Sequence, residues 1–221
     1  DEHMRYVEDW DLWLRMSYLG CRMEWTKKLV CYYRIHSGNM MRNALGMKQG
    51  MVTMLDKLYA HPDLSDEALA LRDSAYANVF LNAAARAFAA GASQDGRNWL
   101  SEAVQLDPSL RDGHPPRVLS SLASFALNLL ADDREIFLTA LSKGIPTGLI
   151  DAHWSKHRAR GLLHGVSAFE CHQEGRYLQT VWHAVVAIAY DPTWLQNRGL
   201  LSIAGRAART QTSKFAGARR R

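Results

Sequence analysis

Apolar residues recur along most of this chain at intervals of three and four positions, the spacing of one face of an α-helix. The pattern predicts helices over about 40–60, 65–90, 94–106, 117–130, 133–143, 151–174 and 193–208, with a break near Gly161 or Gly165. In the first of these the apolar face consists of Met47, Met51, Met54, Leu55 and Leu58. Methionine commonly fills cores, so we interpret this face as packing rather than as a cofactor site. We expect a mainly α-helical protein.

The first forty residues depart from this pattern. A short amphipathic helix is predicted to begin at Glu8 and to end with Gly20 at its C-cap. Its mostly apolar face, which we expect to be buried, consists of Trp10, Trp13, Leu14 and Ser17. Two short strands are predicted next, at about 22–26 and 29–35.

The candidates for chemistry lie in this same stretch. Glu8 and Asp9 are adjacent carboxylates in the first turn of the predicted helix, where the helix dipole favours negative charge. Arg34 and His36 lie on one side at the end of the second predicted strand, because successive side chains of a strand alternate.

The two segments EDWDLWLR at 8–15 and YRIHSGNM at 33–40 together resemble the C-terminal end of an inverting, GT-A-fold glycosyltransferase of family 2. In that family an acidic pair heads a helix, and a Tyr-Arg-x-His strand end follows. The preceding Asp1 and Glu2 also resemble an acidic step that commonly stands before the pair. The resemblance covers residues 1–43 and implies that they are the α/β remnant of a GT-A domain.

The resemblance implies roles for single residues. Asp9 matches the general base that takes the proton of the acceptor hydroxyl, and Glu8 matches its acidic partner. His36 matches a histidine that helps to hold a divalent metal, Mn or Mg, on the nucleotide diphosphate. For His36 the alternative is a strand-end histidine that bonds a backbone carbonyl.

Two further residues are candidates for substrate binding on chemical grounds. Trp10 offers an aromatic face for a sugar ring, although tryptophan on an amphipathic helix is commonly a core residue. The Arg34 guanidinium suits a diphosphate, and a pairing of Arg34 with Glu8 or Asp11 is the alternative.

The sequence contains no nucleotide-binding βαβ unit and no predicted strand that ends in an Asp-x-Asp metal motif. We therefore expect the C-terminal portion of a longer glycosyltransferase, inactive alone, that uses a nucleotide-sugar donor and a glycan or other hydroxyl acceptor, as in polysaccharide biosynthesis. The alternative is a non-catalytic helical interaction module that carries an incomplete catalytic tail.

In the helical part, the positions of small residues, glycine and proline resemble those of tetratricopeptide repeats. Small residues, a glycine and a proline recur in two sets: Ala84, Gly91, Ala103 and Pro108, then Ala168, Gly175, Ala187 and Pro192. The prolines are 84 residues apart, which excludes a regular array of 34-residue repeats. We expect three parts: the end of a GT-A domain at 1–60, a TPR-like helical region at 61–209 that holds a protein partner, and a basic flexible tail at 210–221.

The composition of the chain indicates no further class of function. The net charge of +5 is mild, and we interpret the tail arginines as solvated rather than as a nucleic-acid or lipid site. Three cysteines without a CxxC motif indicate neither a disulfide framework nor a zinc site, and His153 with His157 lacks further ligands. No run is long enough to span a membrane. We expect a cytoplasmic protein, with the inner face of the membrane as an alternative location.

Overall fold

The structure is a computed structural model that describes residues 1–24, 26–32, 39–113, 115–129, 131–146, 149 and 154–218, without the side chains of 41, 131, 132 and 211–218. Within these residues it is all-α. The α-helices are α1 Glu8–Tyr18, α2 Ala44–Tyr59, α3 Asp66–Ala70, α4 Arg72–Ala89, α5 Ser93–Leu106, α6 Arg117–Leu127, α7 Ala131–Gly144, α8 Lys156–Gln173, α9 Tyr177–Tyr190 and α10 Arg198–Ala218. Three short 3₁₀ helices of the described residues lie between the α-helices: η1 Met40–Arg42, η2 Pro108–Arg111 and η4 Pro192–Gln196.

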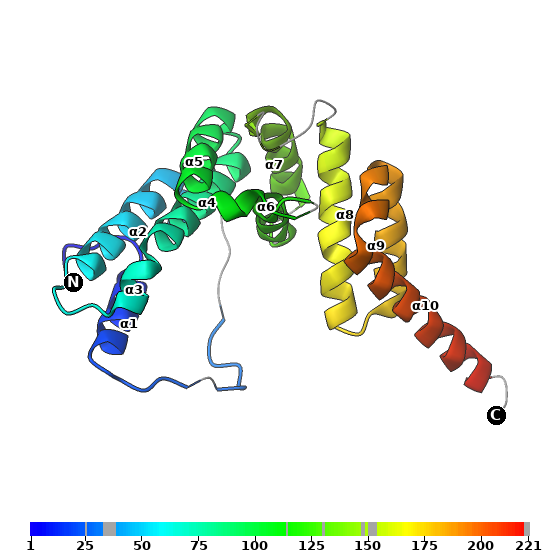
Figure 1. Ribbon diagram of the computed structural model, residues 1–221, viewed down its shortest axis with the longest axis horizontal. Coiled ribbons are helices and arrows are strands. Elements are labelled where there is room, and N and C mark those ends of the chain that lie inside the picture. Colours follow the sequence, from blue (N-terminus) through cyan, green and yellow to red (C-terminus); the bar gives the residue numbers. More distant parts are fainter. Residues whose placement is uncertain are drawn as a thin grey trace.

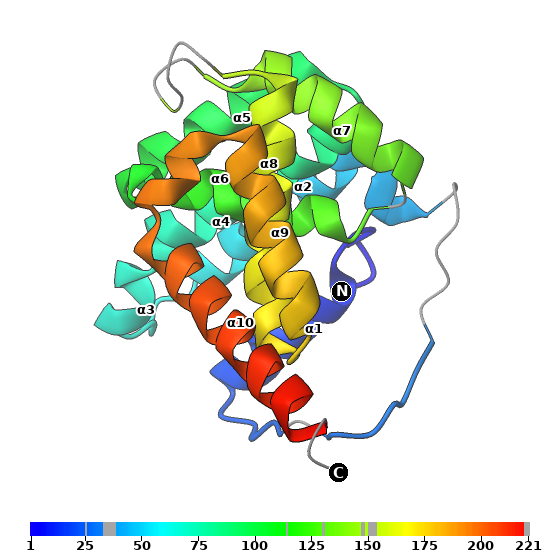
Figure 2. The same cartoon turned by 90° about the vertical axis from the view of Figure 1, so that its right-hand side faces the viewer.

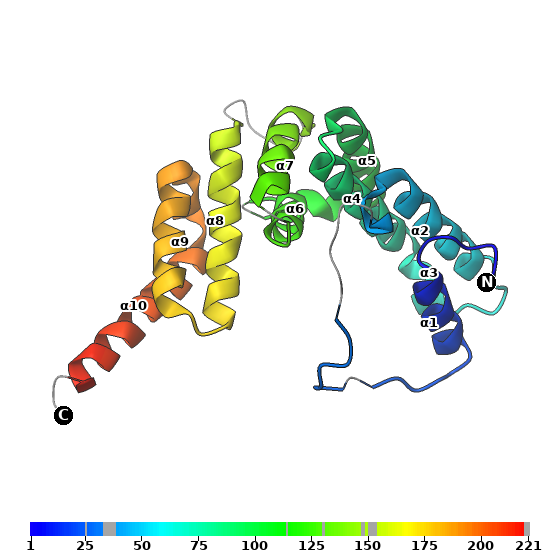
Figure 3. The ribbon, with the colours of Figure 1, turned by 180° about the vertical axis from the view of Figure 1, so that it is seen from behind.

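The helices are arranged as an arch that follows the order of the chain (Figure 1). Helices α1 to α3 lie at one end, α4 to α7 form the middle, and α8 to α10 form the other end, from which α10 extends outward. Figure 3 shows the same arrangement from behind, with the segment after α1 running away from the helices.

The two strands predicted at 22–26 and 29–35 are not found in the described residues, and this prediction was wrong there. Residues 21–24 and 26–32 are irregular and exposed, with Tyr32 at 92% exposure. A strand needs a neighbour for its backbone hydrogen bonds, and the described part of the chain offers no sheet. Residues 33–35 of the second predicted strand lie outside the described residues.

Helix α2 confirms the predicted methionine face. Met47, Met51, Met54 and Leu55 are all buried, and Leu58, the fifth residue of the predicted face, is half-buried. They pack with Val7 and Val79 into a small core that joins α2 to the start of α1 and to α4. The Asn43 side chain accepts a hydrogen bond from the Gly46 N–H and so caps the helix.

The helix predicted from Ser65 to Ala90 is divided into α3 and α4 at Leu71. Ser65 caps α3 as predicted, because its hydroxyl accepts from the Ala68 N–H at 3.2 Å. Helix α4 ends before Gly91, also as predicted.

The two helix pairs α4/α5 and α8/α9 have the same lengths and the same spacing. The bounds of α8 and α9 are those of α4 and α5 shifted by 84 residues, from Arg72 to Lys156 and from Leu106 to Tyr190. The small residues predicted to allow close packing are fully buried in both pairs: Ala84, Ala103, Ala168 and Ala187. We call α4/α5 the first pair and α8/α9 the second pair.

The two pairs also share their turns. Gly91 and Gly175 follow the first helix of each pair with φ of 78° and 72°, where a side chain would be strained. The next N–H bonds back to Ala87 in one pair and to Cys171 in the other, which completes a Schellman cap.

The second helix of each pair ends on an aspartate before a proline. Asp107 accepts from the N–H and hydroxyl of Ser109, and Asp191 accepts from those of Thr193. The same local chemistry therefore starts the 3₁₀ helices η2 and η4.

Helix α8 is continuous, so the break expected near Gly161 or Gly165 does not occur. Both glycines lie at close approaches: a methyl group on Gly161 would meet Tyr190 Cβ at 2.9 Å, and one on Gly165 would overlap the Trp194 indole. The glycines are there for packing. Helix α10 likewise continues past its predicted end near 208 to Ala218.

One large core runs through α4 to α10. Its largest fully buried side chains include Phe88, Phe137, Leu100 and Leu200. Phe88 and Phe137 meet edge to face at 6.1 Å between centroids. The large core is separate from the methionine-rich core at α2, and α4 contributes side chains to both.

Candidate functional site

Helix α1 begins directly after a strained residue. Val7 has φ 53° and ψ 30°, a left-handed conformation that is rare for a β-branched side chain. Its side chain is buried against the α2 methionines, and this packing holds the backbone there. Such strain is commonly retained where a functional group must be positioned.

The acidic pair lies in the first turn of α1, as predicted. Glu8 and Asp9 are both exposed. One Asp9 carboxylate oxygen accepts from the Trp10 N–H at 2.9 Å, which orients the group at the helix start. Both carboxylates of the pair are therefore open to solvent at adjacent positions of the first turn.

A third carboxylate, Asp11, is the one that α1 buries. From the sequence it was expected only as an alternative partner of Arg34. Asp11 is only 2% exposed and lies against α2. It accepts from Lys57 Nζ at 2.7 Å and from Arg15 Nε at 2.9 Å. Lys57 also bonds the Asp1 carboxylate at 2.6 Å. The i,i+4 spacing of Asp11 and Arg15 was the one sequence feature that could have indicated this role.

The Asp11 carboxylate is charged at neutral pH. Burial by itself would raise the pKa of this group, but hydrogen bonds from Lys57 and Arg15 outweigh it and hold the pKa below the ordinary 3.8. Asp11 therefore fixes α1 on α2 and is unsuited to accept a proton. The exposed acidic pair is the part of α1 left for chemistry.

The buried face of α1 differs from the predicted one. Trp10 and Trp13 are 47% and 50% exposed and Ser17 is exposed, so only Leu14 of the expected apolar face is partly buried. Among the described helices α1 packs mainly on α2, and one main neighbour covers only a narrow stripe of its surface. That stripe contains Asp11 and Leu14.

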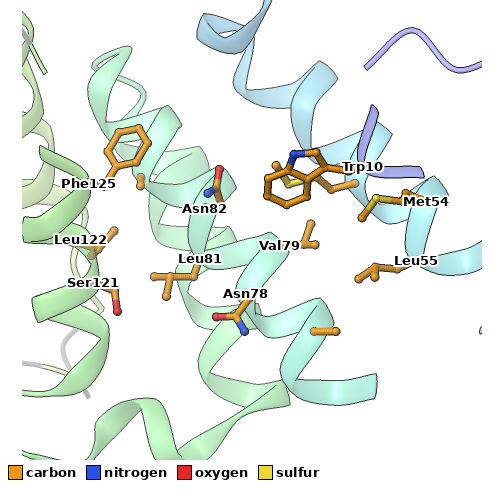
Figure 4. A pocket seen from close by; sticks show the side chains of 13 residues that line it. Trp10, Met54, Leu55, Asn78, Val79, Leu81, Asn82, Ser121, Leu122 and Phe125 are labelled. Carbon is orange, nitrogen blue, oxygen red and sulfur yellow. The ribbon is translucent and has the colours of Figure 1, made fainter. Parts of the chain in front are cut away.

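Trp10 borders a groove of about 340 Å³ between α1, α2, α4 and α6, which we call the Trp10 groove. Its walls are mostly apolar, and Phe125 lies at the far end from Trp10 (Figure 4). Three polar side chains, Asn78, Asn82 and Ser121, also line it. The Trp10 groove is thus a half-open, mostly apolar hollow with a few polar groups on its walls.

The other two predicted site residues, Arg34 and His36, lie outside the described residues. The chain returns to the helices at Arg42, whose guanidinium makes a two-pronged ion pair with Asp133 at 3.0 and 3.1 Å. The Asn43 amide then donates to the Tyr6 hydroxyl at 3.0 Å. These contacts fix the residues that follow the predicted strand end.

The described residues hold no group of three or more His, Cys, Asp or Glu side chains that could bind a metal. His164 instead meets His183 of α9, with 2.9 Å between their Nδ1 atoms, and His157 packs on Tyr190. Burial lowers the pKa of both His164 and His183. All three cysteines are free thiols, Cys171 buried and Cys21 and Cys31 exposed.

No known protein family, curated protein or solved structure matches this chain. Among the described residues no helix is both long and apolar enough to cross a membrane. Any functional conclusion therefore depends on the residues themselves and on the resemblance of residues 1–43.

Proposed function

We propose that the chain takes part in sugar transfer as the C-terminal portion of a family 2-like inverting glycosyltransferase. Asp9 acts as general base and Glu8 as its acidic partner. The helical region at 61–209 does no chemistry and holds a partner. The observation that carries the proposal is the exposed acidic pair in the first turn of α1, directly after the left-handed Val7, whereas Asp11 is buried and ion-paired.

The chemistry requires a carboxylate that can reach an acceptor hydroxyl. In the transfer, the hydroxyl oxygen bonds to the sugar carbon, the bond from that carbon to the diphosphate breaks, and the hydroxyl proton passes to Asp9. Asp9 is exposed and oriented by the Trp10 N–H, whereas Asp11 is buried and ion-paired. Trp10 is proposed to border the acceptor, because its ring is half exposed at the edge of a groove.

The nucleotide-sugar donor and its metal need residues beyond the described ones. Arg34 and His36 stay predictions for the diphosphate and for the Mn or Mg ion. The test is therefore made on the polypeptide that the complete gene encodes.

The experiment compares Asp9→Asn with Asp66→Asn. Asp66 is also an exposed first-turn carboxylate, at the start of α3, and so is a matched control. We expect Asp9→Asn to lower the rate of transfer by about 100-fold or more, the usual contribution of a general base, with unchanged thermal stability. Asp66→Asn should retain the wild-type rate. Wild-type turnover in a folded Asp9→Asn protein would exclude the assignment.

A second function, a non-catalytic helical interaction module, is favoured by the all-helical described fold and by the Trp10 groove. The same assay separates the two. A well-folded product of the complete gene that transfers no sugar from any nucleotide-sugar donor, with or without Mn or Mg, would favour the module.

A further inference from the structure

The outer face of α9 carries an exposed row of apolar side chains. Leu178, Trp182 and Val185 are 61%, 57% and 60% exposed, and the exposed Ala189 continues the row. Figure 2 shows α9 on the end of the arch with α10 beside it. Four positions at i, i+4, i+7 and i+11 give a stripe about 16 Å long on one side of the helix.

The first pair shows that this face does not have to be apolar. The positions of α5 that match the row through the 84-residue shift are Gln94, Asn98, Ser101 and Gln105. They are polar and exposed or half-buried, and Gln94 donates to Asn98 at 3.0 Å. Two helices of equal length with the same caps thus present opposite surfaces, so the apolar row of α9 is a property of the second pair alone.

The spacing of the row indicates what covers it. Intervals of four, three and four residues are those of the a and d positions of a coiled coil, which receive the side chains of one partner helix. A lipid surface is contacted by a broader apolar face. Helix α10 buries Leu200, Ile203 and Ala207 in the core and leaves Leu201 43% exposed.

The charge around the row indicates the charge that the partner carries. Residues 154–221 contain eleven Lys or Arg and three Asp or Glu, against sixteen and nineteen in residues 1–153. No acidic residue follows Asp191, while α10 presents the exposed Arg198, Arg206 and Arg209 beside α9. Two copies of this basic end would repel each other, whereas carboxylates that flank a partner's apolar row would be attracted.

We propose that the row Leu178, Trp182, Val185 and Ala189 is a docking surface for an amphipathic helix of another protein with acidic residues beside its apolar seam. The inference goes beyond sugar transfer. Its test measures binding alone, so its failure and that of the Asp9 assignment are distinguishable.

The probe is a fluorescein-labelled peptide of three heptads with leucine at a and d and glutamate at e and g, and a version with lysine at e and g is the charge control. We expect the full chain to bind the acidic peptide saturably and to bind the basic one at least about tenfold more weakly. The quadruple variant Leu178→Gln, Trp182→Asn, Val185→Ser and Ala189→Gln carries the residues of α5. It should fold, as judged by circular dichroism, and lose at least about tenfold in affinity, because a central tryptophan dominates such interfaces.

Two further variants keep the test decisive. Trp182→Asn alone should weaken binding if the quadruple variant fails to fold, and Gln94→Ala with Gln105→Ala on α5 should leave binding unchanged. Three results would overturn the proposal: equal binding of both peptides or of neither, sedimentation with phosphatidylserine vesicles that depends on Trp182, or self-association of the chain that the quadruple variant abolishes.

Discussion

The first pair and the second pair of helices have the same frame but different side chains on it. Both use a glycine Schellman cap between the helices and an aspartate cap at the end. Yet Leu81 of the first pair and Leu110 of the following η2 are replaced at the matching positions by Gly165 of the second pair and Trp194 of η4. The comparison teaches that caps and small residues determine the helical hairpin, whereas the core and the outer face vary independently.

The largest expected effect comes from the exchanged core positions. Gly165→Leu should destabilise the protein by about 3 kcal/mol or more, because the new side chain would overlap the Trp194 indole. Trp194→Leu alone should also destabilise, by a few kcal/mol, because it leaves a cavity at a buried position. The double variant has the residues of the first pair and should recover most of the loss. Urea unfolding measures the cycle, and losses that simply add would show that the two positions are not coupled.

A smaller effect on stability is expected from the two capping aspartates, and we expect it to differ between them. Asp107→Ala should cost about 1 kcal/mol, the usual contribution of a cap. Asp191→Ala should cost about 2–3 kcal/mol, because Asp191 also bonds the mostly buried Arg158 guanidinium at 3.0 Å. Equal losses in chemical denaturation would contradict this distinction.

The Asp191 effect should depend on pH. Burial raises the pKa of this carboxyl, but bonds from Arg158 and Thr193 outweigh it and hold the pKa below 3.8. A carboxylate whose pKa is lowered by folding stabilises the protein above the unfolded value, and this stabilisation is lost as the pH falls below about 3.8. The gap between wild type and Asp191→Ala should therefore narrow in acid.

The smallest expected effect is a pH dependence of stability that comes from the pair of aromatic rings packed between the two helices of the second pair. In the first pair Phe80 and Trp99 lie 5.4 and 5.2 Å from Lys48 Nζ, a cation–π contact, whereas the matching residues of the second pair are His164 and His183. The Nδ1 contact needs one ring to donate and the other to accept, which two protonated rings cannot do.

Burial lowers the pKa of both rings, and for His183 the nearby His164 and Arg176 lower it further. The unfolded chain thus binds protons more readily, so stability should be full above the ordinary pKa of 6.5 and fall as the pH drops below it. Replacing His164 by Phe and His183 by Trp should remove this slope, and melting temperatures between pH 5 and 8 measure it. A slope that survives the replacement would place the titrating group elsewhere.

Much of the helical fold could be predicted from the sequence because its causes are local. Periodic apolar residues, the Ser65 cap and the glycine at 91 act over one or two helical turns. The failures arose from distant partners. Gly165 looks like a helix break until Trp194 is known to fill its place, and the Asp11 site depends on Lys57, far along the chain.

The candidate site was predicted in part for the same reason. The start of α1 and its exposed acidic pair follow from local sequence, whereas Trp10 is half exposed although it belongs to the face that was expected to be buried. Which face of α1 is buried, and whether residues 21–24 and 26–32 form strands, depend on the neighbouring elements that pack on them. The local sequence does not give those neighbours. Arg34 and His36 stay predictions.

The exposed segment after α1 has a consequence for how the chain is digested. Residues 21–24 and 26–32 are irregular and exposed to solvent. They contain Arg22, Lys27 and Lys28, and trypsin cleaves the peptide bond after such residues. Digestion should begin there and leave the capped helices on either side intact. The two pieces should nevertheless stay together, because the buried Asp11 of α1 is ion-paired with Lys57 of α2. A single cut would therefore change the length of the polypeptide on a denaturing gel without releasing α1 in native solution.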